Sequence, residues 1–559
     1  MPKRRGTRLV VPALAVVVGA VAGGAVAGGA FLVLRHPSPT TALGAPRFVD
    51  ITATSGVDHT YAGLAGIGVG GGVAVFDCDG DGRSDLYLAG GARPASLLRN
   101  ASRRGSIAFA PVPDSAAALT DVTGAYPLDV DGDGAMDLAV LRLGESTLLR
   151  GLGDCRFAPA DAAWGFHPGP GWATAFSATW EGQDAFPTLA VGRYVAVDAK
   201  GEATADCQPN TLLRPASAGA GYGPPIPLTP GHCALSMLFS DWARSGRRDL
   251  RVSNDRHYYD ALTGEEQLWR MSPGEPPRLY TADDGWVQMQ IWGMGIASQD
   301  LTGDGYPEIY LTNLGPNRLQ TLSGSADQPR YRDIGLPRGV NAAEPYAGGD
   351  TLPSTAWHPE FEDVNNDGFV DLFVSKGNVG EVPGYAVKDP SNLLLGQPDG
   401  SFVEGGQAAG IVSFERARGA ALADFDLDGL LDLVVVDLDA PVKVWRNVGG
   451  AGQGADGALP MGHWLALRTH QPAPNPDAVG AWLEVRIGDV KFRRELTVGG
   501  GHVSGQAGWV HVGLGPATDA DVRVTWPDGS VGPWQRATAD GFGIIERGAS
   551  AIQPWTPAP

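Results

Sequence analysis

An acidic phrase that recurs five times is the strongest constraint on what this chain can fold into. Each copy has oxygen-bearing side chains at loop positions 1, 3, 5 and 9, and glycine at position 6. The copies begin at Asp77, Asp129, Asp300, Asp363 and Asp424, which gives gaps of 52, 171, 63 and 61 residues. A short apolar run follows each copy, as expected for a strand. Recurrence at this spacing predicts one repeated structural unit instead of several unrelated domains.

The long gap predicts two further units that have lost the acidic phrase. A gap of 171 residues is three periods of 57, and residues 178–192 and 240–253 each end in a short run that resembles those behind the acidic loops. With 80 Gly and 43 Pro among 559 residues, and 43% hydrophobic residues, the composition favours many short strands and tight turns. We therefore predict an all-β fold whose residues 47–450 form a seven-bladed β-propeller, in which ring closure removes exposed strand edges.

The spacing of oxygen-bearing residues within each copy predicts calcium sites. Calcium takes six to eight oxygen ligands, and carboxylates at alternate positions of a tight loop can point inward to supply them. Position 7 is expected to contribute its backbone carbonyl, because the residues found there share no side-chain chemistry. About five Ca²⁺ ions are predicted, which would offset about half of the formal net charge of −20. The predicted ligands are Asp77, Asp79, Asp81, Arg83 and Asp85; Asp129, Asp131, Asp133, Ala135 and Asp137; Asp300, Thr302, Asp304, Tyr306 and Glu308; Asp363, Asn365, Asp367, Phe369 and Asp371; and Asp424, Asp426, Asp428, Leu430 and Asp432.

Other interpretations of the acidic loops fit less well. An EF-hand needs a bidentate Glu at position 12, where these copies have Leu or Val, and magnesium rarely sits in an all-protein cage. Acidic turns on a solvated surface without any ion are the remaining alternative. The third copy has Thr302 and Glu308, and the fourth has Asn365, where the others have Asp. We therefore expect the sites to differ in affinity.

The first 35 residues predict a signal anchor. Lys3, Arg4 and Arg5 precede an apolar run over residues 9–34. As a helix this run would be about 39 Å long, enough to cross a hydrocarbon core of about 30 Å. The basic residues before it place the N-terminus in the cytoplasm and the bulk of the chain outside it. The alternative is a cleaved signal peptide, with processing at residues 25–27 and secretion of the remainder. Residues 36–46 are a linker in either case.

Four cysteines lie beyond the predicted anchor. An even number of cysteines in an exported chain predicts disulfides. Cys207 with Cys233 is the favoured pair, because the two bracket a loop rich in Pro and Gly. Cys78 with Cys155 is the pairing that remains, without separate support from the sequence.

Several longer stretches resemble known families. The repeats resemble the FG-GAP or VCBS blades of integrin α-subunits, and residues 293–319 make them more similar to those of the cartilage acidic protein family. Residues 460–548 resemble the ASPIC/UnbV domain, through the stretches 479–481, 499–504, 511–515 and 524–529. The resemblance implies a seven-bladed propeller with calcium in blade loops, then a small β domain and a tail over residues 549–559. It implies no known reaction.

Charge and motifs narrow the function. A net charge of −20 argues against nucleic-acid binding, which needs a basic footprint. The chain has no nucleophile elbow, Walker loop or H-E-x-x-H motif, so we expect no enzyme. We expect an adhesion-type scaffold that binds an unknown protein or glycan. The alternative is an enzyme or accessory protein of a biosynthetic pathway, with Arg256, His257 and Tyr259 at the propeller mouth.

A few other residues are candidates for packing or for pockets. The glycine-rich run 66–71 matches G-x-G-x-x-G but leads into a strand-like run, so it favours the start of a blade. Residues 221–227 concentrate Pro, Gly and Tyr in a region without the acidic phrase. Packing is the favoured role for His358, His502 and His511.

Overall fold

The computed structural model describes residues 38–113, 116–216, 221–255, 264–380, 382–450 and 461–557. Residues 36–559 form one compact unit. The described residues are mostly β; their helices are the short turns α1 (Asp161–Trp164), α2 (Gly335–Arg338), α3 (Gly406–Ala409) and a 3-10 turn at Ala282–Asp284. No helix in these ranges is long and apolar enough to cross a bilayer. The predicted anchor over residues 9–34 and the loop with Arg256, His257 and Tyr259 lie outside the described residues.

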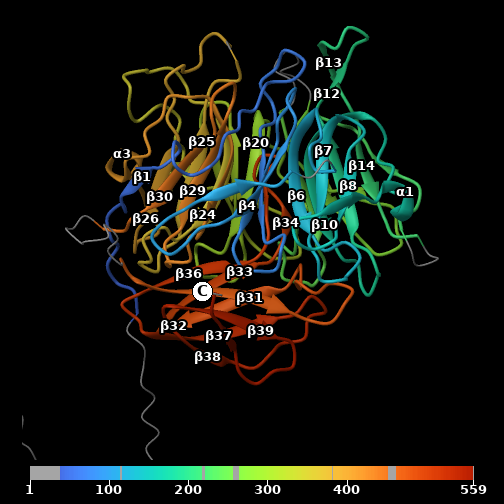
Figure 1. Ribbon diagram of the computed structural model, residues 1–559. Coiled ribbons are helices and arrows are strands. Elements are labelled where there is room, and N and C mark those ends of the chain that lie inside the picture. Colours follow the sequence, from blue (N-terminus) through green and yellow to red (C-terminus); the bar gives the residue numbers. More distant parts are fainter. Residues whose placement is uncertain are drawn as a thin grey trace, which may run out of the picture. The chain divides into compact units, whose positions relative to one another are not determined.

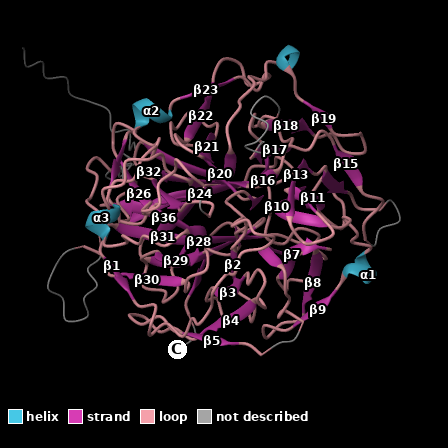
Figure 2. Cartoon of the chain, turned by 90° about the horizontal axis from the view of Figure 1, so that it is seen from above, coloured by secondary structure: helices cyan, strands magenta, loops and turns pink. Residues whose placement is uncertain are grey.

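Seven four-stranded antiparallel units follow one another along the described chain, three of them joined into one larger sheet, and Figure 2 shows them set around a ring. The arrangement is consistent with a β-propeller. The strands are β2 (Val73–Phe76), β3 (Asp85–Leu88), β4 (Ser96–Asn100), β5 (Phe109–Pro111); β6 (Val122–Leu128), β7 (Asp137–Gly144), β8 (Thr147–Gly151), β9 (Phe157–Pro159); β10 (Gly171–Thr179), β11 (Thr188–Arg193), β14 (Asn210–Leu213), β15 (Ile226–Leu228); β16 (Ala234–Ser240), β17 (Asp249–Asn254), β18 (Gln267–Arg270), β19 (Arg278–Leu279); β20 (Gly293–Gln299), β21 (Glu308–Asn313), β22 (Arg318–Leu322), β23 (Tyr331–Asp333); β24 (Ala356–Glu362), β25 (Asp371–Lys376), β26 (Asn392–Gly396), β27 (Phe402–Glu404); and β28 (Ala417–Ala423), β29 (Asp432–Asp437), β30 (Lys443–Asn447), β1 (Phe48–Asp50).

The last sheet joins the two ends of the repeat region. Strand β1, at the start of the described chain, pairs with β30, so that Phe48 lies opposite Asn447. The two units without the acidic phrase, predicted at residues 178–192 and 240–253, contain the hairpins β10–β11 and β16–β17. The run 66–71 leads into β2 as predicted.

The ring's core lies between neighbouring sheets. Each acidic loop connects the first two strands of its sheet, and those strands are rich in Val, Leu, Ala and Phe and are almost wholly buried. Phe109 of the first sheet meets Phe425 of the seventh edge to face at 5.3 Å. Tyr222 is buried against Phe166 and Phe186, so this part of residues 221–227 serves packing.

Both predicted disulfides form: Cys78 with Cys155, and Cys207 with Cys233. The first connects an acidic loop to the turn between β8 and β9 of the next sheet. The second ties the hairpin of β12 (Val195–Val197) and β13 (Ala203–Cys207) to the residue before β16. Such bonds indicate an extracytoplasmic chain.

A second β domain follows and lies below the ring in the view of Figure 1. One of its sheets contains β31 (His463–His470), β36 (Val510–Gly515), β39 (Gly541–Glu546) and β40 (Gln553–Trp555). The other contains β32 (Trp482–Ile487), β33 (Val490–Glu495), β37 (Asp519–Thr525) and β38 (Gln535–Thr538). Alternating apolar residues such as Leu465, Leu483, Val485 and Val512 form its core.

Residues 498–507 of this domain, called here the central segment, enter the ring. Its strand β34 (Val498–Gly499) pairs with β10 and β16, and β35 (Gly505–Gln506) pairs with β2. His502 and Val503 are fully buried. A side-chain carbon on Gly72 of the ring would lie only 1.8 Å from the carbonyl oxygen of Val503. The central segment therefore lies in the middle of the ring and requires glycine on the strands around it.

Candidate metal centres

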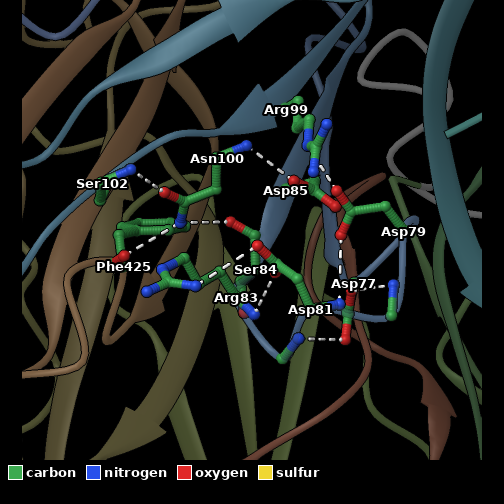
Figure 3. A network of polar contacts seen from close by, with 12 residues as sticks. Asp77, Asp79, Asp81, Arg83, Ser84, Asp85, Arg99, Asn100, Ser102 and Phe425 are labelled. Carbon is green, nitrogen blue, oxygen red and sulfur yellow. Dashed lines mark hydrogen bonds and ion pairs between the residues drawn. The ribbon is translucent and has the colours of Figure 1, made fainter. Parts of the chain in front are cut away.

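The first acidic loop is shaped by its own carboxylates (Figure 3). It connects β2 to β3, and Asp77 accepts hydrogen bonds from the amides of Gly80 and Gly82, both at 2.8 Å. Asp81 accepts the amide of Arg83 at 2.8 Å. Both glycines have positive φ, as the sharp turn requires. These bonds fold the loop so that its acidic side chains lie together.

The position-9 carboxylate anchors the loop to the sheet. Asp85 is buried at the start of β3, and its two oxygens accept the amides of Cys78 and Asn100, each at 2.7 Å. Burial, with Asp79 and Asp77 nearby, raises the pKa of Asp85 to about 8. A carboxylate this poorly solvated is stabilised as an anion by a cation beside it.

All five loops share this frame. In each, the position-1 carboxylate accepts the amide of the position-6 glycine, position 5 accepts the amide of position 7, and position 9 accepts the amide of position 2. The backbone amides of the predicted position-7 residues thus donate hydrogen bonds inside the loop. The prediction that their carbonyls bind metal stays a prediction. The common frame explains why the phrase recurs with fixed spacing.

Three of the loops bring carboxylates together closely enough for one ion. One oxygen from each of three aspartates lies within 4.8 Å of the others, in the sets Asp77, Asp79, Asp85; Asp129, Asp131, Asp137; and Asp424, Asp426, Asp432. Oxygens that bind one Ca²⁺ at about 2.5 Å can be at most about 5 Å apart. The donor sets of the first, second and fifth loops therefore fit calcium, through hard oxygen ligands alone.

The third and fourth loops differ, as their sequences suggested. Neither appears among the sets of three close carboxylates in the described residues. In the third, Arg493 of the second domain donates to Asp300 at 2.8 Å, and Glu308 instead accepts bonds from the hydroxyls of Thr302 and Thr321. In the fourth, Asp367 accepts the amide of Leu43 at 2.7 Å. Burial raises the pKa of Asp367 to about 6 and the pKa values of Asp363 and Asp371 well above the usual range.

An arginine lies beside each of the three converging loops, a feature that the sequence interpretation missed. Arg99 on β4 forms an ion pair with Asp79. Arg150 on β8 contacts Asp131 and Asp133, both at 2.8 Å, and Arg446 on β30 contacts Asp426 at 2.7 Å and Asp428 at 2.6 Å. A signal existed, because each arginine stands 21 or 22 residues after position 1 of its loop. The guanidinium offsets part of the repulsion among the carboxylates.

The second domain rests on all five acidic loops. Arg468 lies 3.5 Å from Asp77, and Trp509 donates to the carbonyl of Gly82 at 3.0 Å. His511 contacts Asn366 of the fourth loop at 2.6 Å, and Arg493 holds the third as described. In the second and fifth loops, added side-chain carbons on Gly132 and Gly429 would meet Pro474 at 3.2 Å and Trp464 at 2.1 Å. The loops that could hold metal are thus also the surface on which the second domain lies.

Comparison with known proteins agrees with this architecture. The FG-GAP-like repeat family matches residues 77–140 and 363–435, and the ASPIC and UnbV family matches residues 471–551. Cartilage acidic protein 1 of Xenopus tropicalis is 23% identical over 512 residues, which is 84% of this chain and 72% of that protein. The human protein is 25% identical over 269 residues, 45% of this chain and 36% of that protein.

Among solved structures, the BBS1N–ARL6DN complex soaked with lead covers 75% of this chain and 99% of its own, with 12% identity and a TM-score of 0.40. A score this low adds nothing to the fold assignment, which depends on the chain's own sheets. The buried aspartate clusters are of the type found in FG-GAP calcium sites. The chain therefore carries FG-GAP-like repeats followed by an ASPIC/UnbV domain, and it is a distant homologue of cartilage acidic protein 1.

Proposed function

We propose that this chain is a calcium-binding, seven-bladed β-propeller that acts outside the cytoplasm as a scaffold for a protein or glycan partner. The observation that carries the proposal is the convergence of three aspartates in each of three loops. The two disulfides support the compartment. Anchoring in the membrane through residues 9–34 is part of the proposal. The scaffold binds its partner without catalysing a reaction.

Calcium in these loops has a structural role. The first, second and fifth loops would hold an ion through their position-1, 3 and 9 aspartates, and the ion would neutralise carboxylates that otherwise repel one another. Because the same loops contact the ASPIC/UnbV domain, bound calcium would also hold that domain against the ring. Binding to the folded state alone raises stability by mass action.

The opposite face of the ring is the proposed partner surface. The acidic loops and the ASPIC/UnbV domain occupy one face, and Figure 1 shows the β12–β13 hairpin rising from the other. Its turn contains the exposed residues Lys200 and Gly201. Loops on a rigid scaffold are common recognition elements, and this hairpin is tied down by the Cys207–Cys233 bond.

The metal content of the purified full-length chain tests the calcium part of the proposal. We expect at least three tightly held Ca²⁺ ions per chain, and Asp79→Asn should remove one of them. Asp154→Asn is the control, because Asp154 lies in an exposed turn outside the converging sets. A chain that retains no calcium at millimolar supply would exclude this function.

Site-specific photo-crosslinking tests the scaffold part. A crosslinker at Lys200 should capture a partner on the surface of the cells that produce the protein. A crosslinker at Asp528 of the ASPIC/UnbV domain should not. Equal capture from both positions would contradict a partner surface on the hairpin side of the ring.

A further inference from the structure

A cavity of about 580 Å³ lies between the ring and the ASPIC/UnbV domain, beside the central segment. Strands β20 and β24 of the ring and residues 494–501 of the domain form part of its wall. Its volume falls in the range of about 300–1,000 Å³ that is usual for small-molecule sites. The first acidic loop borders this space, because Asp77 and Asp79 are among the lining residues.

Two polar atoms at the cavity, one donor and one acceptor, have no hydrogen-bond partner within the described structure. They are Nε2 of His358 and Oε2 of Glu362, and both residues line the cavity. The residues are only 5% and 7% exposed. They stand four positions apart on β24, and both line the cavity. A buried polar atom without a partner is destabilising, and a bound ligand or water would supply the missing hydrogen bond.

The other contacts of these two residues fix their positions. Nδ1 of His358 accepts the amide of His502 at 3.1 Å, so the imidazole is aligned by the central segment. The nearest carboxylate oxygen to its Nε2 belongs to Glu360, at 3.6 Å, which is too long for a hydrogen bond. Oε1 of Glu362 accepts from Arg494, which leaves Oε2 for another donor.

Donor atoms without partners also face the cavity. Nε and Nη2 of Arg468 are buried and unpartnered within the described structure, while its Nη1 lies 3.5 Å from Asp77. The guanidinium carbon of Arg468 lies 4.4 Å from the ring centre of Trp509, which holds the group in place. Each of the three guanidinium nitrogens of Arg494 already makes one bond, to Gln299, Glu362 and the carbonyl of Phe361.

The combination selects a class of ligand. A cation beside Arg468 would meet its guanidinium, and an anion would meet the acidic residues of the lining, which are Asp77, Asp79, Glu360, Glu362, Asp477 and Glu495. A hydroxyl group both donates and accepts, so it can satisfy the glutamate acceptor as well as the imidazole and arginine donors.

We propose that this cavity is a binding site for a neutral, hydroxyl-rich small molecule of one or two sugar units. The site goes beyond the scaffold role, because it lies on the face covered by the ASPIC/UnbV domain and not on the proposed partner surface. Its ligand contacts come from the ring and from that domain together, so only the assembled chain can form it.

Saturation-transfer NMR and calorimetry on the calcium-loaded full-length chain test the proposal. The neutral probes are glucose, N-acetylglucosamine, maltose and myo-inositol, and the charged probes are citrate, glycine and spermidine. We expect saturable binding of at least one neutral probe, weakened at least tenfold by Glu362→Gln. Ser298→Phe, at a half-buried position on the cavity wall, should abolish binding by filling the space. Leu336→Ser, far out on an exposed turn, should leave it unchanged.

Folding of each variant is verified by its melting temperature, and calcium content is measured on the same samples. A loss of calcium with intact saccharide binding would contradict the metal proposal alone. Binding of charged probes only, binding that persists in Ser298→Phe, or no binding by any probe to a folded, calcium-loaded chain would overturn the cavity proposal.

Discussion

Arg493 of the ASPIC/UnbV domain donates a 2.8 Å hydrogen bond to Asp300, the first residue of the third acidic loop of the ring. The same guanidinium bonds Glu484 of its own domain at 3.0 Å. Arg493 therefore joins the two domains at a loop that has Thr302 at position 3 and Glu308 at position 9 in place of aspartate. A fixed cation from the chain supplies there part of the positive charge that a metal ion would supply in the other loops.

Removal of this arginine should loosen the domain contact. Arg493→Met leaves the buried carboxylate of Asp300 without its cation, while Glu484 keeps Arg523, so the unfolding free energy should fall by about 3 kcal/mol. Urea unfolding should show the lower stability. Arg536→Met is the matched control, since the pair of Arg536 with Asp519 is exposed and contributes less than about 1 kcal/mol. Equal effects of the two substitutions would contradict a domain-joining role.

Chelation should destabilise the ring unevenly. Without calcium, the aspartates of the first, second and fifth loops are compensated only in part by their arginines, so a chelator should lower the melting temperature. Hydrogen exchange should rise first at the amides that their carboxylates accept, such as those of Gly82, Gly134 and Gly429. Gly305 of the third loop is the internal comparison, because Arg493 remains beside Asp300. Unchanged melting and uniform exchange would argue that these loops hold no metal.

The sequence predicted the acidic loops because all of their ligands lie within nine residues of one another. The hairpins at residues 178–192 and 240–253 could be placed because the repeats recur at a nearly constant spacing along the chain. Arg99, Arg150 and Arg446 were missed because they act from a different strand, and their identity matters only once the sheet has formed. The central segment was missed for a stronger reason: His502 meets His358 across 144 residues, a contact that no local pattern encodes.

The central segment should tolerate no added atoms on the strands around it. Gly72→Ala would place a carbon 1.8 Å from the carbonyl oxygen of Val503, so either β2 or the segment must move. We expect a loss of 2 kcal/mol or more, about the upper range for overpacked cores. Gly380→Ala is the control, with no atom within 4 Å of the added carbon. Similar urea midpoints for the two variants would mean that the ring centre can relax around the segment.

Acidification should weaken the same region. Burial, with a smaller contribution from Arg418, lowers the pKa of His502 to about 3, so the folded chain keeps this imidazole neutral. The unfolded chain takes up a proton below about pH 6.5, so the stability that neutral His502 contributes is present above that pH and is lost as the pH falls toward 3. At pH 5.5 the loss is about 1.4 kcal/mol. His502→Gln should flatten the dependence of unfolding free energy on pH, whereas exposed His470→Gln should not.

The Cys78–Cys155 disulfide should support the first metal loop specifically. Cys78 is position 2 of that loop, its amide is held by Asp85, and its partner lies in the next sheet. The double variant Cys78→Ser/Cys155→Ser frees position 2 from this attachment, so calcium affinity should fall at the first loop and remain at the second and fifth. The unfolding free energy should also fall by about 2–5 kcal/mol. Cys207→Ser/Cys233→Ser is the control: it should lower stability without changing any calcium affinity, because neither cysteine lies in an acidic loop. Calorimetric calcium titration distinguishes the two, and an equal loss of affinity in both variants would show that the disulfides act through global stability alone.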